Sequence, residues 1–174
     1  CTNGPEHDTM GIRHCGAVRC APEAAEQRTP NGEGTEKMSE QNRRLRAAGI
    51  AAAAWAGLAA VWCVLVPGGA AELPQGVPGT LRSLLVLPLA EELVFRGALL
   101  RLLRPLGEHP ANLCQAVLFA ALHGTLTEKC YALGMGLIFG WAAEQTDSPA
   151  PGVVLHILNN GLVLARALAE RGMG

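Results

Sequence analysis

The sequence predicts an all-α fold: a polytopic membrane helix bundle of about five helices that follows a disordered N-terminal tail. Of the 174 residues, 49% are hydrophobic and 17% are charged, against about 25% charged in a typical globular protein. Mean hydropathy is +0.22, and the apolar residues gather into long runs after residue 46. The net charge of −1 gives no electrostatic basis for binding a polyanion, so we expect no nucleic-acid partner.

Residues 1–46 lack the aliphatic clusters from which a core is built. They hold seven Lys or Arg and seven acidic residues among scattered Gly and Pro, a composition typical of disorder. Met38 opens a polar, basic stretch directly before the first apolar run. We therefore hypothesise a natural start at Met38, in which case residues 1–37 carry no function, and we assign the membrane domain to residues 47–174.

The first predicted membrane helix occupies residues 47–71, which contain no charged side chain. About 20 helical residues cross a hydrocarbon core of about 30 Å. The run is longer than the core of a cleaved signal peptide, which is the competing interpretation. Three arginines precede it, at residues 43, 44 and 46, and the Pro- and Gly-rich loop behind it has no Lys or Arg. The positive-inside rule then places the N-terminus in the cytoplasm.

Four further helices are expected at residues 80–103, 111–126, 130–143 and 151–169. The last three are short for independent membrane spans, so we expect them to be stable only when packed together. Gly136 and Gly140 form a G-x-x-x-G pair in the fourth helix of the bundle. Small residues at this spacing allow helices to approach closely in lipid.

Three charged residues lie near the middle of the 80–103 helix, where each costs roughly 2.5–3.5 kcal/mol on insertion scales. Glu92 and Arg96 are four residues apart on one helix face, within reach of an ion pair, whereas Glu91 lies about 100° around the helix. We expect Arg96 to neutralise Glu92 and to leave Glu91 available as a general base. The alternative is a buried structural network of all three that holds helices together.

Two histidines lie in later apolar helices, His123 in the third and His156 in the fifth. Either of them can simply hydrogen-bond a neighbouring helix, and that interpretation stays open. His156 and Asn160 share a helix face, so both can donate hydrogen bonds to one oxygen, as stabilisation of an oxyanion requires. Phe119 shares a face with His123 and is expected mainly as a core residue.

The sequence offers few of the residue patterns that other hydrolytic mechanisms require. No serine stands in a G-x-S-x-G context and there is no H-E-x-x-H, while the only aspartates, Asp8 and Asp147, exclude an intramembrane aspartate pair. The cysteines of the apolar runs are interpreted as buried hydrophobic residues. Water activated by glutamate remains. We expect no cofactor and assign no metal ligand. A zinc ion bound by Glu91, Glu92, His123 and His156 remains an open alternative.

Three motifs follow one another in the apolar helices. Residues 91–96 read E-E-x-x-x-R, residues 119–123 read F-x-x-x-H and residues 156–160 read H-x-x-x-N. Together and in this order they resemble the CPBP family (CAAX proteases and bacteriocin-processing enzymes, also called Abi), whose members are intramembrane glutamic endopeptidases. The resemblance covers residues 80–164 and implies a helical bundle with a polar cavity that opens within the membrane.

The resemblance also implies roles for the motif residues. Four of them would be catalytic: Glu91 and His123 would activate a water, and His156 and Asn160 would form the oxyanion hole. The other two, Glu92 and Arg96, would support the site. Family members often have six to eight helices, so the missing helices would leave the cavity open or require a partner or homodimer to complete it.

The function expected from this reading is an intramembrane endopeptidase that hydrolyses a peptide bond by glutamate-activated water. Its substrate would be a peptide precursor or a membrane-associated protein. The alternative is a non-catalytic bacteriocin-immunity or scaffold membrane protein that uses the same polar cluster to bind a partner. From the Ala-, Gly- and Arg-rich composition we expect a bacterial protein, embedded in the lipid bilayer of the cytoplasmic membrane.

Overall fold

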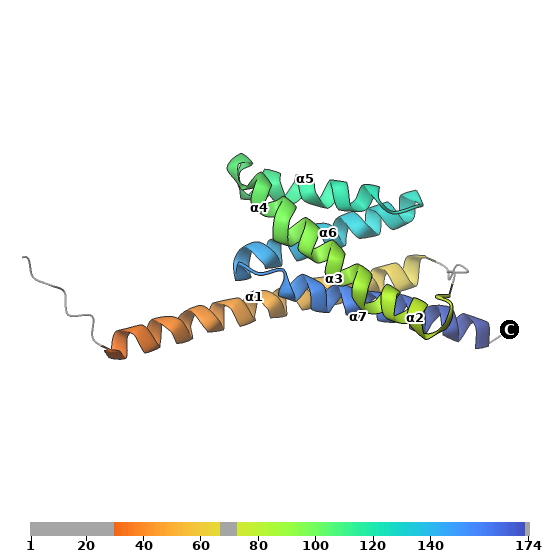
Figure 1. The fold of residues 1–174 in the computed structure, drawn as a ribbon, viewed down its shortest axis with the longest axis horizontal. Coiled ribbons are helices and arrows are strands. Elements are labelled where there is room, and N and C mark those ends of the chain that lie inside the picture. The colour runs from red at the N-terminus through yellow and green to blue at the C-terminus, as the bar shows by residue number, and fades with distance from the viewer. Residues whose placement is uncertain (1–29, 67–72, 173–174) are drawn as a thin grey trace, which may run out of the picture.

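The computed structural model describes residues 30–66 and 73–172, and within these ranges the chain is helical, without strands (Figure 1). The long helices are α1 (Pro30–Leu65), α5 (Glu108–Ala121), α6 (Leu126–Thr146) and α7 (Ala150–Gly172). A continuous helical rod lies between α1 and α5 and consists of α2 (Gly76–Leu81), η1 (Arg82–Val86), α3 (Leu87–Glu92), η2 (Leu93–Leu99) and α4 (Leu100–Leu103). Counted in this way the described chain has 5 helices, and the predicted all-α bundle is confirmed.

In the part of the chain that the structure describes, two helices are long and apolar enough to cross a membrane, over Glu36–Leu65 and Ala150–Gly172. Both expose much of their surface, and the rod between them exposes large apolar side chains as well, among them Leu85, Leu89 and Leu93. A water-soluble protein rarely exposes so continuous an apolar surface. The surface is the kind expected of helices that face lipid.

The helix α1 begins at Pro30, so the expectation of disorder over residues 1–46 is wrong for residues 30–46. Once the apolar run has formed a helix, each further residue adds a hydrogen bond at little entropic cost. The Arg44 guanidinium also pairs with Glu40 one turn earlier, at 2.5 Å. Residues 1–29 lie outside the described residues, as do residues 67–72, which include the predicted end of the first helix.

The rod contains the predicted 80–103 helix and begins slightly earlier, at Gly76. Two of its segments, η1 and η2, are π-helical. Pro88 lies just after η1 and has no backbone N–H to donate to the preceding turn, which loosens the regular hydrogen-bond pattern there. η2 begins directly after Glu92, and π-helical segments within α-helices are frequent at functional sites.

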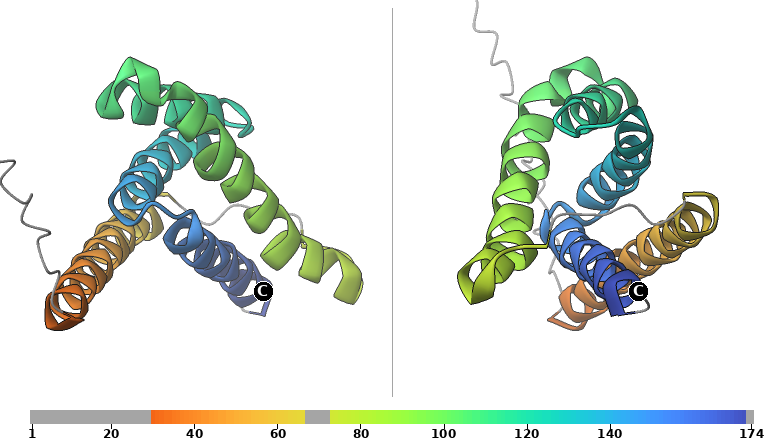
Figure 2. Two further views of the ribbon diagram at one scale, coloured as in Figure 1. Left: turned by 60° about the vertical axis from the view of Figure 1, so that its left-hand side comes forward. Right: turned by 90° about the vertical axis from the view of Figure 1, so that its right-hand side faces the viewer.

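The fold is arranged so that α7 lies between two diverging helices. α4 and α6 both contact α5, and from there the rod and α6 diverge (Figure 2). α7 contacts α6 on one side and α3 and η1 on the other. Residues of α1, α6 and α7 form one core cluster, which includes Ala51, Phe139 and Leu155. A residue on the inner face of α7 can therefore meet residues of both the rod and α6.

Close packing of α6 against α5 depends on glycine. A Cβ atom on Gly136 would lie 2.9 Å from the Cα of Ala116, and one on Gly140 would overlap the side chain of Asn112. The close approach predicted for the G-x-x-x-G pair is thus present. Because the two helices lie so close, the Gln115 side chain can donate a hydrogen bond to the Gly136 carbonyl, at 2.9 Å.

The predicted 111–126 helix ends early, because α5 stops at Ala121. His123 therefore lies in the short connection to α6, and its expected position inside a helix is wrong. Thr125 begins the next helix with a capping box: its hydroxyl accepts from the Glu128 N–H, and the Glu128 carboxylate accepts from the Thr125 N–H. This T-x-x-E signal is visible in the sequence and fixes where α6 begins.

Candidate functional site

Two charged residues of the rod, Glu92 and Arg96, meet in the protein interior. Arg96 Nη1 donates to Glu92 Oε1 at 2.9 Å, and both side chains are fully buried. The pairing predicted from their spacing is confirmed. The Arg96 guanidinium also lies 4.4 Å from the centroid of the Phe119 ring. A buried charge is tolerated when it is paired in this way and packed against an aromatic face.

His156 of α7 joins this pair on its other side. Its Nδ1 lies 3.0 Å from Glu92 Oε1, the oxygen that also accepts from Arg96. A carboxylate that is paired with a guanidinium acts as an acceptor, so we assign the proton of neutral His156 to Nδ1. The imidazole Nε2 is then left without a proton.

Glu91 faces that second nitrogen. Its Oε2 lies 3.7 Å from His156 Nε2, and 34% of its side chain is exposed, whereas the Glu92 side chain is completely buried. The two adjacent acids thus flank the two nitrogens of one imidazole. Glu92 already has two partners, while Glu91 is the acid that a further group can reach.

Glu92 fits against the backbone of α7 where that helix begins. A Cβ atom on Gly152 would overlap Glu92 Oε2, so only glycine leaves room for this carboxylate. The same oxygen is buried and has no hydrogen-bond partner among the described residues. Gly152 therefore helps to determine how deeply Glu92 can reach toward His156.

Phe119 lies between the two histidines. Its ring centroid is 5.1 Å from that of His123 and 5.8 Å from that of His156, and both contacts are edge-on. Phe119 is fully buried, as its predicted core role requires. His123 Nδ1 donates to the Phe119 carbonyl at 3.2 Å, which directs the other ring nitrogen away from that bond.

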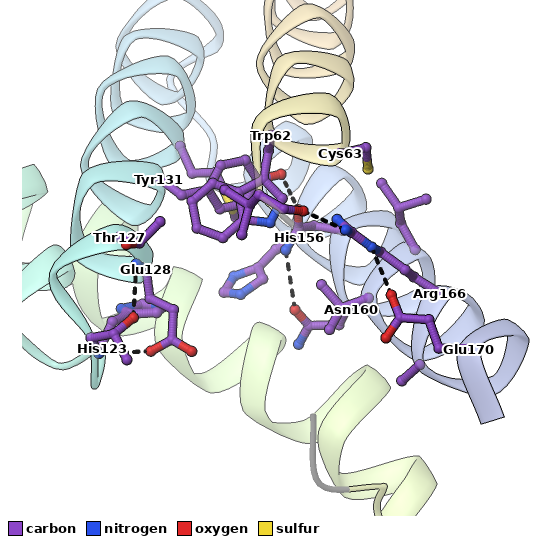
Figure 3. A pocket seen from close by; sticks show the side chains of 17 residues that line it. Trp62, Cys63, His123, Thr127, Glu128, Tyr131, His156, Asn160, Arg166 and Glu170 are labelled. Carbon is purple, nitrogen blue, oxygen red and sulfur yellow. Dashed lines mark hydrogen bonds and ion pairs between the residues drawn. The ribbon is translucent and has the colours of Figure 1, made fainter. Parts of the chain in front are cut away.

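A cavity of about 560 Å³ adjoins these residues. His123, His156 and Asn160 line it, together with side chains of α1, α6 and α7 (Figure 3). Three of the four predicted catalytic residues therefore share one cavity. Glu91 is not among its lining residues, and its described contact toward the cavity is the one with His156. In the described structure Glu91 and His123 form no recorded hydrogen bond or ion pair.

Asn160 stands where α7 meets the rod. Its Nδ2 donates to the Ser83 carbonyl at 2.9 Å. It also borders a second, smaller cavity of about 240 Å³. One Nδ2 hydrogen is used by Ser83, which leaves the other for a group bound in the larger cavity.

The sequence reasoning missed a polar network beside the site. Tyr131 donates to Asn159 Oδ1 at 2.6 Å, and Trp55 Nε1 donates to the same oxygen at 3.3 Å. Asn159 Nδ2 in turn lies 3.5 Å from Asn160 Oδ1. The network joins α1, α6 and α7, and its contact with the Asn160 side-chain oxygen helps to position Asn160. The available signal was the pair of adjacent asparagines in an apolar helix.

The donor set gives no support for a metal. No group of three or more His, Cys, Asp or Glu side chains in the described ranges is arranged to hold one. Glu91, Glu92 and His156 lie together, but His123 is bonded to its own preceding turn, so the four side chains that would suit zinc do not all converge.

Comparison with known proteins identifies the family. A family model for type II CAAX prenyl endopeptidase Rce1-like proteins matches residues 73–162, just over half of the chain, and this range contains all three motifs. No curated protein and no solved structure gives a significant match. On the family match, the chain belongs to the type II CAAX prenyl endopeptidase Rce1-like family, a family of membrane proteases.

Proposed function

We propose that the protein is an intramembrane endopeptidase that uses a glutamate-activated water to hydrolyse a peptide bond of a peptide precursor or membrane-associated protein. The observation that carries the proposal is the line Glu91, His156, Glu92 and Arg96, of which His156 lines the cavity. Ionisable residues paired with one another beside a largely apolar cavity are the expected form of an enzyme site within a membrane.

Glu91 is the proposed general base. It is the more accessible of the two acids, and it has the weaker of the two contacts with His156. Glu91 would take a proton from a bound water while the water oxygen attacks the carbonyl carbon of the substrate. His123, across Phe119 from His156, would help to hold that water.

His156 and Asn160 are the proposed donors to the oxyanion. Because Nδ1 of His156 is bonded to Glu92, Nε2 donates only after the ring has gained a second proton. Glu91, 3.7 Å away, is in position to pass on the proton it takes from water. When the tetrahedral intermediate collapses, the C–N bond breaks and His156 would give this proton to the leaving nitrogen, which returns the imidazole to its neutral form. Glu92 would then stabilise the imidazolium, and Arg96 would hold Glu92 in place, which makes both of them positioning residues.

The proposal is tested by comparative peptidomics of host membranes and culture supernatant. Wild type is compared at matched expression with Glu91→Gln and with Glu40→Gln, a control in which the altered acid is exposed and distant from the site. New peptide termini are expected with wild type and Glu40→Gln and are expected to vanish with Glu91→Gln. Retained cleavage in the Glu91 variant contradicts the mechanism. Identical profiles from three equally stable proteins would favour a non-catalytic immunity or scaffold role.

A further inference from the structure

One face of α7 lines the large cavity well beyond the site described above. Residues recur along this face every three or four positions, namely His156, Asn160, Val163, Ala167 and Glu170. Arg166 belongs to the same stripe. It lies beyond residue 162, where the family match ends, so the match assigns it no role. The proposed hydrolysis does not use it either.

Arg166 is held in place but retains hydrogen-bonding capacity. Its Nε donates to Glu170 at 3.1 Å and one Nη2 hydrogen to the Val66 carbonyl at 2.5 Å, and 26% of its side chain is exposed. A guanidinium has five N–H groups. In the described structure these two bonds use two of them, and the cavity is the space that the side chain borders (Figure 3).

The cavity lining holds one guanidinium, that of Arg166, together with the carboxylates of Glu128 and Glu170, and Arg166 is already paired with Glu170. An anion that binds here therefore uses the N–H groups of Arg166 that its two described partners leave free. The part of the lining that comes from α1, through Trp62, Cys63 and Val66, is mostly apolar. In such surroundings a guanidinium attracts a carboxylate more strongly than in bulk water. Its planar fork also matches a carboxylate in two parallel hydrogen bonds.

We propose that Arg166 binds a carboxylate of the peptide substrate and thereby determines which peptide bond reaches His156. This inference rests on the proposed function. The two residues are ten positions apart on α7, about 15 Å along the helix at a rise of about 1.5 Å per residue. An extended peptide covers about 3.3 Å per residue, so the carboxylate belongs about four or five residues from the bond that is cleaved.

Binding is measured separately from turnover, on full-length Glu91→Gln protein in detergent, by the change in tryptophan fluorescence. The probes are short N-acetylated alanine–leucine peptides in two matched pairs. In the first pair, one peptide ends in a free carboxylate and the other in a carboxamide. In the second pair both peptides are amidated, and one carries an internal Glu where the other carries Gln. The pairs distinguish a C-terminal carboxylate from a side-chain carboxylate as the group that is bound.

Four proteins are compared: the parent and its Arg166→Gln, Arg166→Lys and Arg104→Gln variants. Arg104 is the matched control, because it also forms an ion pair, with Asp147, but does not line the cavity. We expect the parent and the Arg104 variant to bind one carboxylate peptide about tenfold more tightly than its neutral partner. The preference should be lost in Arg166→Gln and reduced in Arg166→Lys.

Equal binding of acid and neutral peptides by the parent overturns the inference, as does failure of every peptide to bind. A preference that persists in Arg166→Gln overturns it too, and would leave Arg166 as a structural link between α7 and the end of α1. If Arg166→Gln fails to fold, the Arg166→Lys comparison decides, because lysine keeps the charge and loses the fork. A carboxylate preference in a protein whose wild type cleaves nothing would support the binding site while rejecting the peptidase proposal.

Discussion

At the scale of single residues, the proposed mechanism depends on the different roles of Glu92 and Glu91. Glu92 is fully buried between Arg96 and His156, whereas a third of the Glu91 side chain remains exposed. The i,i+4 spacing was sufficient to predict the Glu92–Arg96 pair, since it is a property of one helix. The bond from His156 to Glu92 joins residues 64 positions apart and depends on how α7 packs against the rod. No local pattern contains that information.

Replacing Glu92 by Gln is expected to impair folding as well as activity. The change leaves the buried Arg96 guanidinium without its counter-charge, which typically costs about 3–5 kcal/mol. Thermal unfolding in detergent should therefore begin at a clearly lower temperature than in wild type. Glu91→Gln is the matched control, because its side chain is partly exposed, and it should unfold like wild type. Equal stability of the two variants would contradict the assignment of the two acids.

Gly152→Ala is expected to displace Glu92. The added Cβ overlaps the carboxylate, and overpacking of this kind costs typically about 1–3 kcal/mol. Gly161→Ala is the control on the same helix, since nothing lies within 4 Å of its Cβ position. In the control, replacing helical glycine should be neutral or stabilising by roughly 0.5–1 kcal/mol. Unfolding temperature and cleavage rate are both measured, and a Gly152 variant that behaves like the Gly161 variant refutes the packing argument.

At the scale of elements, apolar runs predicted the helices well and their ends poorly. The rod, α6 and α7 all extend beyond their predicted ranges, and α1 continues into polar sequence as far back as Pro30. Hydrophobicity reports what is buried or faces lipid, whereas a helix ends where capping and chain direction dictate. For this reason α5 ends at Ala121, and His123 lies in the connection to α6, where it lines the cavity.

The capping box of α6 is expected to stabilise the turn that carries His123. Thr125→Ala removes the hydroxyl that accepts from the Glu128 N–H and should cost about 1 kcal/mol, while Thr125→Ser retains the bond. Thermal unfolding should separate the two variants, with Ser close to wild type. Indistinguishable unfolding of the Ala and Ser variants would show that the cap does not contribute.

At the scale of the whole molecule, the described chain is a membrane protein of few helices with a largely apolar surface. Its core clusters are small, and the buried polar residues lie where helices cross, as in the contacts of Arg96 and Gln115 with the Gly136 carbonyl. In lipid, where apolar burial between helices contributes little, close packing at glycines and such hydrogen bonds hold the bundle together. The candidate site lies at another such crossing, that of α7 with the rod.

Replacing one residue, Glu91, is therefore expected to remove the proposed catalysis without impairing folding. Among the described ion pairs, Glu91 reaches the network through its 3.7 Å approach to His156, and its side chain is partly exposed, so its loss should leave the bundle intact. Glu92 and Arg96, which form the buried ion pair of the line, are expected to be needed for both.

The most direct test of this account is the cleavage rate of a substrate peptide by purified wild-type and Glu91→Gln protein in lipid nanodiscs, with unfolding temperatures measured on the same samples. The variant is predicted to cleave at least about a hundredfold more slowly, as expected on loss of a general base, and to unfold at the wild-type temperature. Cleavage within a few-fold of wild type by an equally stable variant would contradict the assignment of Glu91 as the base.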